Sequence, residues 1–414
     1  MRRGKKTRSR VRKTIEGIAN ESGPSLFKRT FRMNEDTFEK LFKVIEEALE
    51  TVLKPFKDNH RFVHNGVISQ RLRLAMALRI FAGSCAEDVM LIFGVSKCEV
   101  HHSVDYVTDA ILETSALDIC FPTDHSEQLA VAERFKNKSD VGFDKCVGCV
   151  DGMLIWILKP SDKECKKAKV GSKTFYCARK HKFGLNMQGV CDADKRFTYI
   201  SLSFPGSVSD FLAFENSSLR RKLGEEGYLH NRLCLFGDNA YVNRSYMATP
   251  YSQHSGIDIT RDHYNFFHSQ LRINIECVFG ILVQRWGILR KPFHHQYSIQ
   301  KICKIVECLV RIHNFLIDNN LQENLPTEHI DEDQLNLVVN GAIDLQVNKI
   351  RELNGVSVPL PEDLLHGGEH FDDDLDRSSR RQPINEILPR EVLLEQVSLL
   401  DMRRPARSRA RTPG

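Results

Sequence analysis

Two aspartates in this 414-residue chain directly follow short apolar segments. Asp151 comes after Cys146–Val150, and Asp238 comes after Leu233–Gly237. Because apolar runs of this length are typical of buried strands, we expect both carboxylates at strand ends, where loops begin. A carboxylate at the end of a buried strand is costly unless it is paired or binds a cation. The simpler interpretation of either residue alone is a turn former or a helix cap.

A third acid, Glu276, lies in an amphipathic pattern that predicts a long helix over residues 268–289. Glu276 lies about 100° around the helix from Ile275, and Arg272 lies one turn before it. The pattern indicates either a carboxylate held beside a sheet or an ordinary Arg–Glu ion pair. The apolar face expected to pack on the sheet consists of Ile275, Val278, Phe279, Leu282 and Trp286.

Two aspartates and a glutamate on such elements are the ligands that two-metal phosphodiester chemistry needs. Hard divalent cations prefer carboxylate oxygens, and two Mg²⁺ ions about 3.5–4 Å apart can act together. One ion activates the attacking water or 3′-hydroxyl, and the other stabilises the leaving oxygen. We therefore predict that Asp151, Asp238 and Glu276 are both the catalytic residues and the ligands of Mg²⁺, with Mn²⁺ as the alternative ion.

The elements around these acids predict an α/β domain over residues 145–318. A turn at residues 192–195 makes a hairpin of the two strands beside it. Asp210 is expected to cap the helix that it opens, with a metal-binding role as the alternative. The predicted strands are 146–150, 153–158, 183–191, 197–204 and 232–236, and the predicted helices are 210–223, 268–289 and 299–316.

Residues 25–125 are predicted to be all-α and to contain a helix-turn-helix. Two capping boxes, in which a Ser is followed three residues later by a Glu, open its last two helices. DNA contacts are predicted near the start of the final helix, at Lys97, His101 and His102. The alternative is a small helical bundle that touches no DNA. The predicted helices are 25–58, 69–82, a short one from Ser84 to Gly94, and one from Ser96 to about Leu112.

Several short blocks, taken in order, resemble the PIF/Harbinger transposase superfamily. They are Val147–Gly152, Phe183–Asp192, Phe204–Asp210, Leu235–Tyr241, Tyr264–Gly280 and His313-Asn314, within about residues 145–315. The resemblance implies an RNase H-like fold with a catalytic triad of Asp151, Asp238 and Glu276. It also implies a separate partner protein with a Myb-like DNA-binding domain. Relatives commonly carry Lys seven residues after the catalytic Glu, where this chain has Val283.

Charge is concentrated towards the two ends of the chain. Residues 1–13 carry eight Lys/Arg, residues 403–414 carry five Arg, and residues 320–376 carry 14 acids against two bases. Basic arms suit polyanions, so we expect binding to double-stranded DNA, with a localisation signal or simple solubility as the alternative. The expected location is the nucleus, with the cytoplasm as a second location. Residues 1–24 are predicted to be a disordered basic arm, and 319–414 an acidic and then basic tail that is largely disordered.

The acidic part of that tail is the expected docking surface for the partner protein. If so, truncation after Asn319 should leave nicking by the purified protein intact. The alternative is a solvated tail without a partner.

A second basic segment, Lys159–Lys182, carries nine Lys/Arg and two acids and includes Phe175 and Tyr176. Its composition predicts a surface that follows DNA phosphates, with a solvated loop as the alternative. The contacts predicted here and on the long helix are Lys166, Lys167, Lys180 and Arg272.

No apolar run approaches the roughly 20 residues of a membrane span, so binding to a membrane is not expected. The 12 cysteines are scattered and are expected to be reduced. The favoured function is a metal-dependent DNA endonuclease and transposase, which could form homo-oligomers. The alternatives are a domesticated DNA-binding protein that no longer transposes and an RNase H-type nuclease acting on RNA hybrids.

Overall fold

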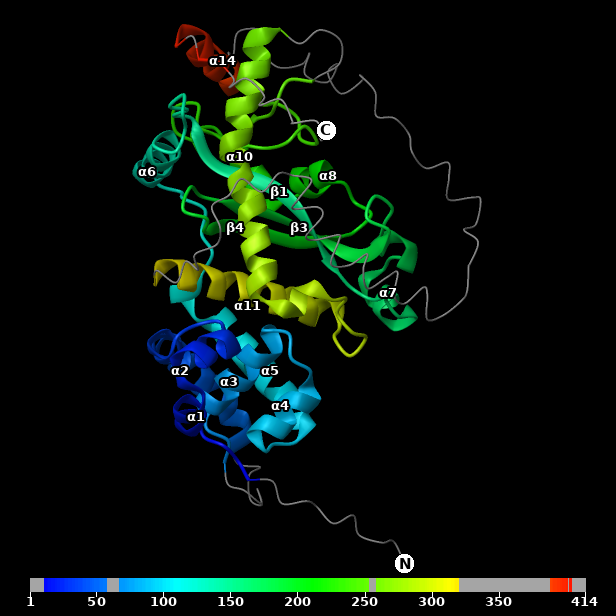
Figure 1. Ribbon diagram of the computed structural model, residues 1–414. Helices are drawn as coiled ribbons and strands as arrows, with labels where there is room; N and C mark the ends of the chain where they lie inside the picture. Colours follow the sequence, from blue (N-terminus) through cyan, green and yellow to red (C-terminus); the bar gives the residue numbers. More distant parts are fainter. Residues whose placement is uncertain (1–10, 58–66, 253–257, 320–387, 401, 404–414) are drawn as a thin grey trace, which may run out of the picture. The chain divides into compact units, whose positions relative to one another are not determined.

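The computed structural model describes residues 11–57, 67–252, 258–319, 388–400 and 402–403. Contacts divide the chain into two compact units, Met1–Leu321 with Leu388–Gly414, and Gln322–Ile387. The second unit, and with it the acidic segment 320–376, lies outside the described residues. The first unit contains a group of N-terminal helices and a mixed α/β domain (Figure 1).

The N-terminal helices form a helical module, residues 15–113, around a shared apolar core. Phe38, Leu74 and Val104 from three different helices are all fully buried there. The helices predicted at 69–82 and from Ser96 are confirmed by α3 and α5. The module consists of α1 (Ile15–Phe31), α2 (Glu35–Lys57), α3 (Gln70–Phe81), α4 (Ala86–Phe93) and α5 (Lys97–Glu113).

The start of the module corrects the prediction of a disordered arm over residues 1–24. Helix α1 begins at Ile15, because the Thr14 side chain caps it by accepting a hydrogen bond from the Gly17 N–H at 3.1 Å. Ile15 and Ile18 are buried, so this stretch is held by packing despite its basic neighbours. Residues 1–10 lie outside the described residues.

The single helix predicted over residues 25–58 is also wrong, because two helices meet there. Arg32 adopts a left-handed conformation (φ 63°) that ends α1. The Asn34 side chain then accepts a hydrogen bond from the Thr37 N–H at 2.8 Å and so caps the next helix.

The two predicted capping boxes have different outcomes. Ser96 caps α5 by accepting from the Glu99 N–H at 3.2 Å, as expected. The cap of α4 is Cys85 rather than Ser84, with its sulfur 3.4 Å from the Asp88 nitrogen. Gly94 ends α4 in a left-handed conformation (φ 66°), as predicted.

A six-stranded mixed sheet is the centre of the α/β domain. Strand β1 lies between β3, which is antiparallel to it, and β5, which is parallel to it. β3 also pairs antiparallel with β2 and β4, and β5 pairs parallel with β6. The strands are β1 (Cys146–Trp156), β2 (Tyr176–Cys177), β3 (Lys182–Cys191), β4 (Phe197–Pro205), β5 (Cys234–Phe236) and β6 (Met247–Ala248).

The two strands predicted on either side of Asp151 are one continuous strand. β1 runs for 11 residues, and Asp151 is in its middle, opposite Gly189 of β3. The expectation that Asp151 follows a strand end is therefore wrong. The long ladder with β3 continues through Asp151 and Gly152, because the backbone of both residues still pairs with the next strand.

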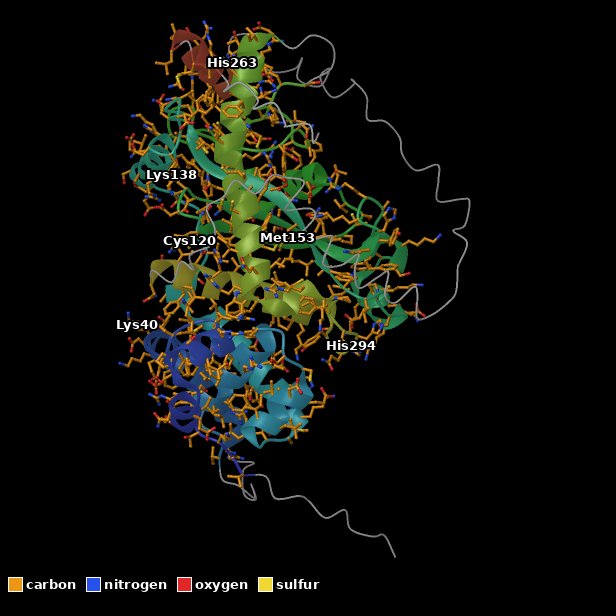
Figure 2. All side chains as sticks on the ribbon, in the orientation of Figure 1. Lys40, Cys120, Lys138, Met153, His263 and His294 are labelled. Carbon is orange, nitrogen blue, oxygen red and sulfur yellow. The ribbon has the colours of Figure 1, made fainter. Side chains whose placement is uncertain are left out.

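Helix α10 lies across one face of the sheet and contacts β1, β3 and β5 (Figure 1). It begins at Ile259, nine residues before the predicted start, and ends at Arg285. The predicted apolar face is confirmed, since Ile275, Val278 and Leu282 are fully buried. Met153, which shares one face of β1 with Asp151, is labelled on the strand in Figure 2.

The remaining helices of the domain surround the sheet and its loops. The predicted helix at 299–316 is confirmed by α11, which also packs against α5 of the helical module. These helices are α6 (His125–Lys136), α7 (Asp162–Ala168), α8 (Asp210–Glu215), α9 (Ser218–Leu223) and α11 (Ile299–Asp318), with short 3-10 helices η1 (Ser115–Leu117), η2 (Ser172–Phe175) and η3 (Gly287–Arg290).

One further helix lies within the tail over residues 319–414, most of which is outside the described residues. Helix α14 (Pro389–Leu399) packs against α10 and β6 of the α/β domain. Leu393 and Val397 are buried in this contact, and the Arg390 guanidinium lies 4.1 Å from the centre of the Tyr251 ring. Residues far along the chain therefore complete the domain.

Candidate active site

Asp151 is the most deeply placed acid of the predicted triad. Its side chain leaves the middle of β1 on the face that α10 covers, since Cys149, two residues earlier, donates its S–H to the Leu271 carbonyl of α10. The Asp151 carboxylate accepts a hydrogen bond from the Gly152 N–H at 2.7 Å. Burial, followed by the nearby charge of Asp238, raises the pKa of Asp151 to about 7.

Asp238 lies two residues beyond the end of β5, as the sequence predicted. Its carboxylate accepts a hydrogen bond from the Ala240 N–H at 2.9 Å, which fixes the loop. Because β5 is parallel to β1 and pairs directly with it, Asp238 comes close enough to Asp151 for their charges to interact. Burial is the main cause of the raised pKa of Asp238.

Glu276 and Arg272 lie one turn apart on α10 and form an ion pair. Both side chains are largely buried, 14% and 12% exposed respectively. Burial alone would lower the pKa of Arg272, but the charges of Glu276, Asp151 and Asp238 raise it overall. The guanidinium therefore contacts Glu276 and lies close enough to Asp151 and Asp238 for their charges to act on it. The ion pair predicted as one interpretation of this pattern is present in the structure. The other interpretation, a functional carboxylate beside the sheet, stays a prediction.

Asp210 is a fourth acid at this site, and its predicted role as a helix cap is wrong. Ser209 caps α8 by accepting from the Leu212 N–H at 3.3 Å. The predicted helix 210–223 is moreover two helices, because Ser217 caps α9 separately. The Asp210 carboxylate instead accepts hydrogen bonds from the side chains of Asn186, Gln188 and Arg179.

The donor set of the site is that of a hard divalent cation. The charge of Asp238 raises the pKa of Asp151, and burial raises the pKa of both aspartates, so a positive charge beside them would stabilise their ionised forms. Arg272 supplies one such charge. Among the residues that the structure describes, no three His, Cys, Asp or Glu side chains close on one point as a metal site. The chemistry of the carboxylates fits a cation, and binding one would require Glu276 and Arg272 to move apart.

Comparison with known proteins gives this geometry a context. Residues 150–314 match the protein family described as DDE superfamily endonuclease, and Asp151, Asp238 and Glu276 all lie in that range. The chain is 26% identical over 292 residues to "Putative nuclease HARBI1" of Bos taurus, which covers 69% of this chain and 79% of that protein. It is 22% identical over 313 residues to "Protein ALP1-like" of Arabidopsis thaliana, covering 71% of each. No solved structure matches.

Residues 150–314, called the DDE domain below, are similar to DDE superfamily endonucleases, and the chain is similar to proteins named HARBI1. The resemblance found in the sequence is confirmed. The match begins at β1 and ends within α11, so the DDE domain includes every acid described above.

The predicted DNA contacts around the DDE domain lie in different surroundings. Lys166 and Lys167 on α7 are exposed, and so is Lys180 in the turn between β2 and β3. Arg272 is 12% exposed and pairs with Glu276, and its predicted contact to DNA stays a prediction. Its position on α10 had indicated the ion pair, but its burial depended on how α10 lies on the sheet.

The three predicted contacts on α5 differ in exposure, because α11 packs against one side of this helix. Lys97 and His102 are exposed, and Lys97 pairs with Glu87 of α4 at 2.5 Å. His101 is half-buried, and burial followed by the charge of Lys301 on α11 lowers its pKa. Lys304 of α11 also binds Asp109 at 2.7 Å. One side of α5 therefore contacts the DDE domain, while its first turn stays accessible.

No clear sequence signal marks the hydrogen-bonded side chains behind the acids. Gln188 donates to Asp210 at 3.1 Å and accepts from the Tyr241 hydroxyl at 2.7 Å. What pointed to Gln188 and Tyr241 in the sequence was their position within the Harbinger-like blocks. At Val283, where relatives carry Lys, the exposed Arg290 donates to the backbone carbonyl at 3.1 Å.

Proposed function

We propose that the chain is a divalent-metal-dependent DNA endonuclease that cleaves phosphodiester bonds with Asp151, Asp238 and Glu276. The observation that carries this proposal is that Asp151 and Asp238 lie close enough for their charges to interact, within the residues that match the DDE endonuclease family. The charges of both aspartates also act on Arg272, which pairs with Glu276. A buried cluster of like charges is costly to maintain for packing alone, which favours a role in binding cations.

We further propose that the DDE domain has an RNase H-like fold. In support, three antiparallel strands (β1, β3 and β4) are followed across the sheet by two parallel ones (β5 and β6). One acid lies on the central strand, one follows its parallel neighbour, and one lies on the helix across the sheet. The geometry of β1, β5 and α10 thus gives each acid of the triad a rigid support.

In this proposal, Asp151, Asp238 and Glu276 would hold Mg²⁺ or Mn²⁺, which supplies activation of a nucleophile and stabilisation of the leaving oxygen. The N–H groups of Gly152 and Ala240 orient the two aspartates towards the shared site. Arg272 favours the ionised form of both aspartates, against the burial that raises their pKa. Phe279 packs over Gly189 of β3 and keeps water from this part of the sheet face.

The proposed DNA-binding surface combines the exposed lysines of α7 and the β2–β3 turn with the first turn of α5. We propose that α4 and α5 are a helix-turn-helix, supported by the capped α5 and by the left-handed Gly94 between them. A nuclear location, a Myb-like partner and homo-oligomers belong to the same proposal. Among the described residues, no helix is long and apolar enough to cross a membrane.

The test is a plasmid-nicking assay with Mg²⁺, Mn²⁺ or EDTA. Asp151→Asn, Asp238→Asn and Glu276→Gln should each lower divalent-dependent nicking by about 100-fold or more, because each removes one ligand charge. Glu226→Gln, an exposed acid outside the site, is the matched control and should nick normally. Melting curves should show that all four variants fold. Normal nicking by any of the first three would remove that residue from the triad.

A domesticated DNA-binding protein without cleavage activity is the second candidate. It is favoured by Val283 and by the ion pair of Arg272 with Glu276, which engages one acid of the triad. DNA binding by a chain that never nicks in either metal would support it.

A further inference from the structure

Arg179 is a surface cation that reaches the acidic cluster. It lies in the four-residue turn Ala178–His181 between β2 and β3, which is closed by a hydrogen bond from the His181 N–H to the Ala178 carbonyl at 3.3 Å. Its side chain is 71% exposed, yet its Nη2 lies 3.3 Å from Asp210 Oδ2. An ion pair with so exposed a partner is weak, so it can exchange readily.

The acid of this pair is fixed, in contrast to the arginine. Asn186 Nδ2 and Gln188 Nε2 donate to Asp210 Oδ1 at 2.9 and 3.1 Å, and the Asp210 side chain is only 12% exposed. Gln188 is held in turn by the Tyr241 hydroxyl. The Oδ2 atom is thus left facing the surface turn, where Arg179 meets it.

The charges of this ion pair affect the pKa values of the catalytic aspartates. After burial, the charges of Asp238 and then Asp210 raise the pKa of Asp151. At Asp238, burial again comes first, Asp210 acts in the same direction, and Arg179 acts in the opposite one. The position of the Arg179 side chain therefore changes the electrostatic field in which a cation would bind.

We propose that Arg179 is a movable countercharge, which pairs with Asp210 in the DNA-free chain and contacts a backbone phosphate when DNA binds. A guanidinium forms strong, directional bonds with phosphate, which favours the transfer. The transfer leaves the Asp210 charge uncompensated, so the site attracts a divalent cation more strongly. DNA and cation then bind cooperatively, each increasing the affinity for the other by the same factor. This inference rests on the proposed function, because it places both ligands at one site.

The test measures Mn²⁺ binding to the full chain by electron paramagnetic resonance, with and without a short DNA duplex, after subtraction of binding to DNA alone. In the wild-type chain, DNA should tighten Mn²⁺ binding by about fivefold or more. Arg179→Gln should bind Mn²⁺ more tightly than wild type without DNA and should lose most of the response to DNA. Arg221→Gln makes the same charge change at an exposed position on α9, outside both proposed binding surfaces, and should leave Mn²⁺ affinity unchanged.

A second variant asks whether Arg179 acts through Asp210. Asp210→Asn keeps an oxygen for the two amide donors but removes the charge, so adding Arg179→Gln to it should change Mn²⁺ affinity no further. If wild-type Mn²⁺ binding is seen and is lost in Asp151→Asn, but Arg179→Gln behaves as wild type, this inference is wrong and the proposed function stands. If the wild-type chain binds no Mn²⁺ with or without DNA, both are wrong.

Discussion

Gly152 leaves the space in which the Asp210 carboxylate lies close to β1, the strand that carries Asp151. A Cβ atom at this position would lie 1.9 Å from Asp210 Oδ1 and 2.8 Å from Gln188 Nε2. Both side chains are held by hydrogen bonds, so neither can move aside cheaply. The glycine is required by space, not by backbone conformation.

Gly152→Ala should therefore displace Asp210 and Gln188, lower divalent-dependent nicking by about tenfold or more and destabilise the fold by about 1–3 kcal/mol. Gly171→Ala is the matched control, because φ is −75° there and a Cβ would meet no atom within 4 Å. Nicking rates and urea midpoints of both variants check the prediction. Equal nicking rates in the two would show that Asp210 is not needed where it lies.

The buried side chain of His313 is expected to make the free energy of unfolding depend on pH. Its Nε2–H donates to the Lys195 carbonyl at 2.9 Å, and its Nδ1 faces Arg285 Nη1 at 3.5 Å, which suits a neutral ring. Burial, followed by the charge of Arg285, lowers the pKa of His313 to about 3. Between that value and about 6.5, the unfolded chain binds a proton that the folded chain does not.

The contribution of His313 to stability should thus be fully present above about pH 6.5 and should fall by about 1.4 kcal/mol per pH unit below it. His313→Gln keeps an amide donor for the carbonyl and cannot titrate. Its urea midpoint should fall less than that of wild type between pH 7 and pH 5. Parallel curves for the two proteins would contradict the prediction.

At the scale of elements, α5 is held to α3 by a buried charge. The Arg73 side chain is 4% exposed and donates to Glu99 and to the Ser103 hydroxyl, each at 3.1 Å. Glu99 was predicted to complete a capping box with Ser96, but in the structure its carboxylate pairs with Arg73. The charge of Arg73 could not be assigned to the core from sequence, because arginines are seldom buried.

Glu99→Ala should destabilise the helical module by about 3 kcal/mol, because it leaves the Arg73 guanidinium buried without its carboxylate. Glu113→Ala removes an exposed acid from the same helix and should cost less than about 0.5 kcal/mol. Thermal melting of the two variants checks the difference. Similar melting temperatures would show that Glu99 adds little to the pair.

The elements best predicted from sequence are those whose signal is local. The hairpin of β3 and β4, the apolar face of α10 and the Ser96 cap depend on neighbouring residues alone. The continuity of β1 was missed because Asp151 and Gly152 interrupt the apolar pattern. Their extended backbone is stabilised instead by pairing with β3, which is distant in the sequence. Asp210 was assigned to a cap because Ser209 and Asp210 are equally good capping residues by type.

At the scale of the whole molecule, α14 changes what a truncation would do. The sequence predicted that truncation after Asn319 spares nicking, but this change also removes Leu393 and Val397 from their buried sites. Fully burying such side chains contributes about 1.5–3 kcal/mol each. No local pattern could place α14 on α10, since the contact joins distant parts of the chain.

Truncation after Asn319 should therefore lower the melting temperature and reduce nicking, whereas removal of residues 322–387 alone should affect both less. Leu393→Asp should reproduce the truncation, and Leu399→Asp, at a site 78% exposed on the same helix, should behave as wild type. Differential scanning calorimetry checks the series. A truncated chain that melts like wild type would show that α14 adds nothing to the domain.

The packing of α14 also has a consequence for synthesis of the protein. About 70 residues separate Asp318, the end of α11, from Pro389, the start of α14. At about 5–20 residues per second, a ribosome needs roughly 4–14 s to cover that interval. During this time the nascent DDE domain has all its acids and its sheet, but the surface of α10 that will receive Leu393 is uncovered. Chaperones that bind apolar surface would have this window in which to act.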